Sequence, residues 1–128
     1  MSCLIKDMTT EQKKAFLLLK TVIFTYHGLD EDEKTILRNT AKDLDAEEEM
    51  EWAYNFIKED IHTFFDRART FFKNTIGMYD HETKISYLNM VWEATNSKGY
   101  ISEMEATAML KFAKDWGIQK DLLLLIRK

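Results

Sequence analysis

The chain of 128 residues contains no proline, four glycines and one cysteine. Without proline, no position in the chain removes a backbone N–H donor and thereby forces a helix to end. Each glycine follows an apolar segment of helical periodicity, where helices commonly end. The single Cys3 excludes an internal disulfide framework and suits a reducing compartment. We therefore expect an all-α protein with a cytoplasmic location.

Long hydrophobic runs are also missing. The longest ones, residues 17–19 and 122–126, are far too short to span a bilayer. The first eight residues include two charged side chains and only a short apolar pair, which is not the pattern of an export signal. No linker or low-complexity segment interrupts the sequence. We expect one domain over residues 1–128, without a transmembrane segment.

Basic residues are scarce in one part of the chain. Residues 30–60 hold 12 acidic and 4 basic residues, within a formal net charge of −4 for the whole protein. Such an acidic segment argues against nucleic acid as the main partner. It is compatible with a cation site, with a basic protein partner, or with acidic helix faces that are simply solvated.

A helix-entry pattern is present twice, at an offset of 72 residues. The copies are GLDEDE at residues 28–33 and GYISEME at residues 99–105. In each, a glycine precedes an N-cap residue, and a glutamate follows three positions after the cap, which is the capping-box pattern. The caps are Asp30 and Ser102, and the glutamates are Glu33 and Glu105. Residues 41–43 and 113–115, both Ala-Lys-Asp, continue the match, so we predict two pseudo-symmetric helix–turn–helix halves.

Apolar periodicity and capping signals predict a bundle of about seven helices. They run from Thr9 to a stop at Gly28, from Asp30 to Leu44, from a capping box at Asp45 to Ile57, over residues 59–76, from His81 to a stop at Gly99, from Ser102 to Trp116 with Gly117 at C′, and from about Ile118 to Ile126.

Two helices carry more apolar surface than one core face requires. The segment 59–76 includes Ile61 and four phenylalanines, lies between the repeats and is expected to end at Gly77. We expect its rings to fill the space between the halves, and the alternative is an exposed partner-binding face. The leucines at 122–125 cannot all face one core, so we expect some to cover the aromatic helix and some to form a homodimer contact.

The repeated pattern resembles the TerB-like family, which includes tellurite-resistance protein TerB and the N-terminal region of a membrane-anchored DnaJ-type co-chaperone. The family pattern is an apolar helix ending in Asp-Gly, then a cap, two residues and Glu, then a Leu-rich helix. Residues 94–118 match it well, and the resemblance extends over about 10–127. It implies a non-catalytic binding or scaffold module in a tellurite-resistance type of stress response, with protein partners that are basic or membrane-associated.

The resemblance also implies where a site would lie, because acidic residues near the family's turns are suspected metal or partner contacts. The candidates in this chain are Asp30, Glu33, Asn96 and Glu105, as ligands of a divalent cation or as acceptors for a basic partner. The chain departs from the family pattern at His27 and Lys98, which stand where the family has Asp.

Two alternatives to this function remain open. As an EF-hand loop, the second copy has Asn96 at position 3, Gly99 at position 6 and Glu105 at position 12, but Ala94 and Lys98 replace carboxylates that calcium requires. A degenerate EF-hand-like metal sensor is the first alternative, and a homo-oligomeric interaction module is the second. No phosphate-binding loop, nucleophile elbow or HExxH motif is present, so the sequence gives an enzyme no positive support.

Overall fold

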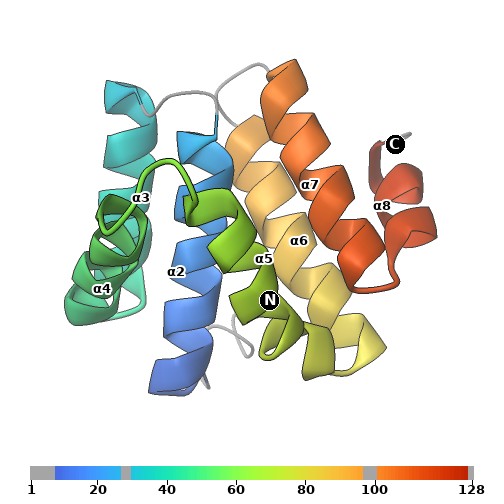
Figure 1. Ribbon diagram of the computed structural model, residues 1–128, viewed down its shortest axis with the longest axis horizontal. Helices are drawn as coiled ribbons and strands as arrows, with labels where there is room; N and C mark the ends of the chain where they lie inside the picture. The colour runs from blue at the N-terminus through green and yellow to red at the C-terminus, as the bar shows by residue number, and fades with distance from the viewer. Residues whose placement is uncertain (1–7, 27–29, 97–100, 127–128) are drawn as a thin grey trace.

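The described part of the chain is built of α-helices packed side by side (Figure 1). The computed structural model describes residues 8–26, 30–96 and 101–126. These residues form seven α-helices and one 3-10 helix, and no strand lies among them. The α-helices are α2 (Thr10–Thr25), α3 (Glu31–Asp43), α4 (Glu47–Lys58), α5 (Phe64–Lys73), α6 (His81–Asn96), α7 (Glu103–Asp115) and α8 (Gln119–Ile126). The all-α bundle of about seven helices is therefore confirmed.

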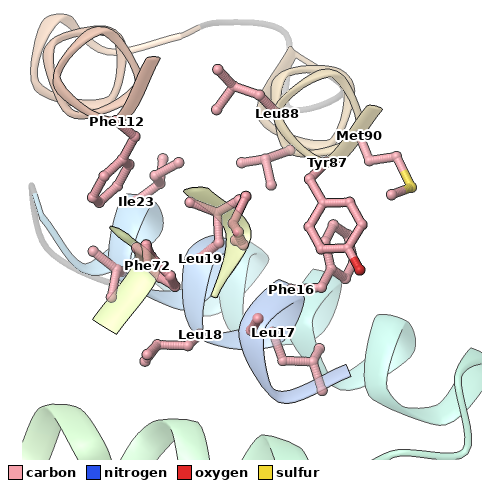
Figure 2. Packing of buried hydrophobic residues seen from close by; sticks show 14 of the residues in the cluster. Phe16, Leu17, Leu18, Leu19, Ile23, Phe72, Tyr87, Leu88, Met90 and Phe112 are labelled. Atoms are coloured by element: carbon pink, nitrogen blue, oxygen red, sulfur yellow. The ribbon is translucent and has the colours of Figure 1, made fainter. Parts of the chain in front are cut away.

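Helix α2 lies at the centre of the bundle. It begins at the predicted capping box, in which the Thr9 side chain accepts a hydrogen bond from the Gln12 N–H at 3.2 Å. Residues 15–24 are all buried, and α2 packs against α3, α4, α5, α6 and α7. Figure 2 shows its side chains reaching in several directions, with Phe16 beside Tyr87 of α6 and Ile23 near Phe112 of α7. A helix that is apolar all round has to be enclosed in this way.

The internal repeat is longer than the sequence pattern indicated. At the offset of 72 residues, α2, α3 and α4 coincide with α6, α7 and α8 to within a few residues at their ends, and α5 lies between the two sets. Each half is thus three helices rather than a single helix–turn–helix. In the parts of the chain that the structure describes, no helix is long and apolar enough to cross a membrane.

The middle helices of the two halves, α3 and α7, end in the same backbone motif. The N–H of Ala46 donates to the Ala41 carbonyl at 2.8 Å, and the N–H of Ile118 donates to the Ala113 carbonyl at 2.9 Å. Such a bond is the 6→1 hydrogen bond of a Schellman motif, whose C′ residue is left-handed. The C′ residues are Asp45, with φ of 52°, and Gly117, with φ of 74°.

The prediction of a capping box at Asp45 was wrong. The N-cap of α4 is Ala46, and no side chain caps that helix. Asp45 occupies the left-handed position that ends α3, and its N–H donates to the Lys42 carbonyl at 3.1 Å. Asp tolerates this conformation better than most residues, so one acidic residue can serve either role in a sequence pattern.

The aromatic helix is shorter than predicted, because α5 covers only Phe64–Lys73. Before it, the Asp60 carboxylate accepts a hydrogen bond from the His62 N–H at 3.0 Å, and this local bond favours a turn over a helix. Ile61 in that turn is 63% exposed rather than part of the buried stripe. Gly77 does not end the helix either. It lies in the 3-10 helix Ile76–Met78, where an added Cβ would come within 3.3 Å of the Phe72 carbonyl oxygen.

The phenylalanines of α5 join the two halves of the core. Phe72 is fully buried and meets Phe112 of α7 edge-on, with ring centroids 5.2 Å apart. On the other side, Phe71 contacts Trp52 of α4 at 5.5 Å. Phe65 also packs on Phe112, at 5.2 Å. These rings fill the space between the repeats, as we expected.

The paired Schellman motifs lead to opposite expectations for their two C′ residues. The backbone at Gly117 is left-handed, and no atom lies within 4 Å of the position that an added Cβ would take. The cost of Gly117→Ala is therefore backbone strain. We expect this change to lower the free energy of unfolding by about 1 kcal/mol, and Asp45→Gly to raise it by a similar amount. Urea unfolding of both variants measures this, and a stabilised Gly117→Ala protein would contradict the assignment.

Candidate functional site

The two predicted turns lead into α3 and α7 through complete capping boxes. Asp30 accepts a hydrogen bond from the Glu33 N–H at 2.8 Å, and Glu33 accepts one from the Asp30 N–H at 3.1 Å. In the second copy, Ser102 accepts from the Glu105 N–H at 3.1 Å, and Glu105 accepts from the Ser102 N–H at 3.0 Å. Figure 1 shows that α3 and α7 both start at the same end of the bundle. The sequence pattern therefore predicted both caps correctly.

The four candidate residues differ in their exposure. Glu33 and Glu105 are 0% exposed, whereas Asp30 and Asn96 are exposed to solvent. A buried carboxylate requires hydrogen-bond partners, and the N–H group of each cap residue is one such partner for its glutamate. Their position therefore gives them a structural task at the helix entries, while Asp30 and Asn96 are the members of the set that solvent reaches.

A shared metal site for these residues stays a prediction. Among residues 8–26, 30–96 and 101–126, no group of three or more His, Cys, Asp or Glu side chains could hold a metal ion. The glycines of the two turns, Gly28 and Gly99, and the departures from the family pattern, His27 and Lys98, lie outside the described residues.

Exposed carboxylates surround the start of α3. Asp30, Glu31 and Asp32 all face solvent in the first turn of this helix. Negative charge here is favoured by the helix dipole, whose positive end lies at the N-terminus. The acidic turn can therefore exist without a ligand, and its exposed oxygen atoms are also available to a cation or to a basic side chain.

The structure reveals a buried cation that the sequence analysis missed. Lys20, in the middle of α2, is only 6% exposed, and its amine donates a hydrogen bond to Thr40 Oγ1 of α3 at 2.5 Å. Burial lowers the pKa of Lys20 to about 8, and the nearby Asp43 carboxylate partly offsets this. A cavity of about 280 Å³ adjoins these groups, lined in part by Thr40, Asp43 and Glu93. The one available signal was a single charge within the largely apolar run of residues 15–24.

A second charged contact connects α5 to α7. The Arg69 guanidinium binds both carboxylate oxygens of Asp115, at 2.8 and 2.9 Å. This hydrogen-bonded pair lowers the pKa of Asp115, whose side chain is 8% exposed. Asp43 is the equivalent of Asp115 in the first half, and it lies near Lys20. The aspartate at the end of each middle helix therefore has a cation near it, Lys20 of α2 for Asp43 and Arg69 of α5 for Asp115.

Lys20 makes stability depend on pH in a defined direction. Because its pKa is lowered from 10.5 to about 8 by folding, the unfolded chain binds more protons between these values, and stability rises with pH there. Below this interval both states are charged, so the folded state carries the full cost of the buried charge. We expect Lys20→Met to be more stable than the wild type at pH 7, and its advantage to shrink by about 1.4 kcal/mol per pH unit above pH 8.

Urea unfolding of both proteins at pH 7 and pH 9.5 measures this difference. Lys120→Met is the matched control, because Lys120 is exposed on α8 and should show no such dependence. An advantage of Lys20→Met that is the same at both pH values would contradict the buried-charge interpretation.

Comparison with known proteins gives no match. No protein-family model, no curated protein and no solved structure matches the chain. The resemblance to the TerB-like family therefore remains a hypothesis, supported by the repeated turns and not by a match.

Proposed function

We propose that the protein is a TerB-like, non-catalytic binding or scaffold module of the cytoplasm, acting in a stress response of the tellurite-resistance type. The observation that supports this proposal is the pair of matched helix entries. Each has a complete capping box with a fully buried glutamate, at the same offset in the two halves and at the same end of the bundle.

The exposed part of the first entry is the binding surface in this proposal. Asp30, Glu31 and Asp32 present carboxylates to solvent, where a divalent cation or the Lys and Arg side chains of a basic partner can reach them. The buried Glu33 and Glu105 hold the backbone of each entry through their caps. In this arrangement the glutamates position the turns, and the solvent-facing acids and Asn96 make the contacts.

The difference between the two N-cap residues suggests a substitution that removes a negative charge and keeps the helix cap. Ser102 caps α7 with a hydroxyl where Asp30 caps α3 with a carboxylate, so Asp30→Ser keeps an N-cap and removes one negative charge. We expect metal-stripped wild-type protein to show saturable amide NMR shifts at residues 30–33 and 102–105 with calcium, magnesium, manganese or zinc, or with a lysine-rich peptide. We expect Asp30→Ser to lose the shifts at 30–33 while its melting temperature without ligand changes little.

The same titration also tests the EF-hand-like sensor. A rise in melting temperature with metal, from a ligand that binds only the folded state, would favour the sensor. Shifts with the peptide alone would favour a basic protein partner. If neither metal at millimolar concentration nor the peptide shifts these amides, the proposed binding surface is wrong and the capping boxes are purely structural.

The exposed leucines of α8 favour one further function, assembly with a second copy of the chain. Leu122 is 1% exposed and belongs to the core, whereas Leu123 and Leu124 are 41% and 60% exposed. The side chain of Leu125 lies outside the described residues. Adjacent large apolar side chains in solvent are typical of an interaction surface.

Mass measurement in solution tests this assembly. We expect a concentration-dependent dimer for the wild type, and a monomer for Leu124→Glu, because a charge in an apolar contact loses its hydration without gaining a partner. Lys42→Glu, a charge reversal at an exposed position of α3 away from α8, is the control and should leave the dimer intact. A monomeric wild type, or a dimer that survives both Leu123→Glu and Leu124→Glu, would exclude this interface.

A further inference from the structure

A groove runs between α3 and α4, on the part of the chain that the sequence marks as acidic. Its volume is about 450 Å³, within the range of pockets that hold small molecules. The apolar part consists of Ala41, Met50 and the ring of Tyr54, of which Ala41 and Met50 are almost fully buried. The groove therefore has a built apolar floor rather than a flat solvated surface.

The rim of this groove is basic. Lys34 and Arg38 of α3 and Lys58 of α4 line it, together with one acid, Glu47. Residues 30–60 hold only four basic residues among 12 acidic ones, so three of those four converge here. Because α3 and α4 are joined by a short turn, the start of α3 lies beside the end of α4, and this brings Lys34 and Lys58 together.

The positive charges of the rim are available to a ligand. Within the described residues, neither Arg38 nor Lys58 forms an ion pair. Lys34 contacts Glu31 at 3.0 Å, but both side chains of this pair are exposed, and such surface pairs are weak. Glu31 is not one of the groove residues.

Tyr54 links the apolar floor to the basic rim. Burial raises the pKa of the Tyr54 hydroxyl, while the nearby Arg38 and Lys34 charges act in the opposite direction. The hydroxyl is therefore a neutral hydrogen-bond donor at neutral pH that lies within the field of both cations. Two cations and a hydroxyl above an apolar floor form an environment for a ligand with a negative head and an apolar body.

We propose that the α3–α4 groove binds a small amphipathic organic anion. A carboxylate or phosphate head contacts Arg38 and Lys34 and accepts a hydrogen bond from Tyr54, and the apolar body lies on Met50 and Ala41. The guanidinium of arginine can bind both oxygens of such a head. Glu47, on the first turn of α4 and therefore away from Lys58, disfavours a second negative group at that end.

The surrounding charge favours a small ligand over a polyanion. Residues 30–60 hold 12 acidic residues, most of them exposed, so an extended polyanion such as nucleic acid would meet repulsion beyond the groove. A small anion is enclosed by the rim and interacts chiefly with the nearest charges, because salt screens the more distant ones.

Amide NMR titration of the full chain tests the proposal. The probes are decanoate, decyl phosphate, decanol and inorganic phosphate, each below any micellar concentration. We expect decanoate or decyl phosphate to shift amides of α3 and α4 saturably, the tighter of the two identifying the head group. Decanol and inorganic phosphate should bind at least about tenfold more weakly, because each lacks one half of the recognition.

Variants locate the site. Arg38→Gln should raise the Kd of the bound amphiphile about tenfold, and Tyr54→Phe should raise it less, while Lys120→Gln, the same charge change on exposed α8, should leave it unchanged. Arg38 and Lys120 are exposed, and Tyr54→Phe keeps the ring that packs against the core, so we expect all three variants to fold, which thermal unfolding checks.

Three results would overturn the proposal. These are equal affinity for decanol and decanoate, an Arg38→Gln variant with unchanged Kd, and no binding of either amphiphile at millimolar concentration. If the amphiphiles fail but a glutamate-rich peptide shifts the same amides, the groove serves an acidic protein segment instead, and the small-ligand proposal is wrong.

Discussion

The structure depends on the burial of α2 on every side. Residues 15–24 leave this helix without a polar face, so its folding requires cover from both halves of the chain at once. Helices α3 and α4 cover it from one half and α6 and α7 from the other, with α5 between them. The single cation in this run, Lys20, donates a hydrogen bond to Thr40 and lies near the Asp43 carboxylate and over the Phe16 ring.

The two halves are related by local motifs and held together by different contacts. Each middle helix starts with a capping box and ends with a Schellman motif, so side-chain-to-backbone hydrogen bonds set its start and backbone hydrogen bonds set its end. Between the halves, α2 packs directly against α6 and α7, and α5 adds its rings and the Arg69–Asp115 pair with α7. The repeat thus provides two similar units of three helices. Helix α5, which has no counterpart in the repeat, helps to join the two units into one core.

Both proposed binding surfaces include residues of α3. The first turn of α3 presents carboxylates to solvent at Asp30, Glu31 and Asp32, whereas Lys34 and Arg38, farther along, face the groove against α4. Opposite charges on neighbouring turns provide separate surfaces for a cationic and an anionic ligand.

The sequence by itself determined the features that depend on residues within one or two turns. The helix entries at Thr9, Asp30 and Ser102 and the stop at Gly117 were predicted because caps and C′ residues act through neighbouring backbone groups. Local signals also misled where one residue type suits two roles. Asp45 ends a helix instead of starting one, and Asp60 forms a turn where apolar periodicity indicated a helix.

Only the tertiary structure decided which distant residues meet. Arg69 and Asp115 are 46 positions apart, and Lys20 and Thr40 are 20 apart, so no local pattern could pair them. The basic groove has the same origin, because Lys34, Arg38 and Lys58 gather only when α3 and α4 pack side by side. Packing of apolar faces decides these encounters, and it is a property of the whole core rather than of any short segment.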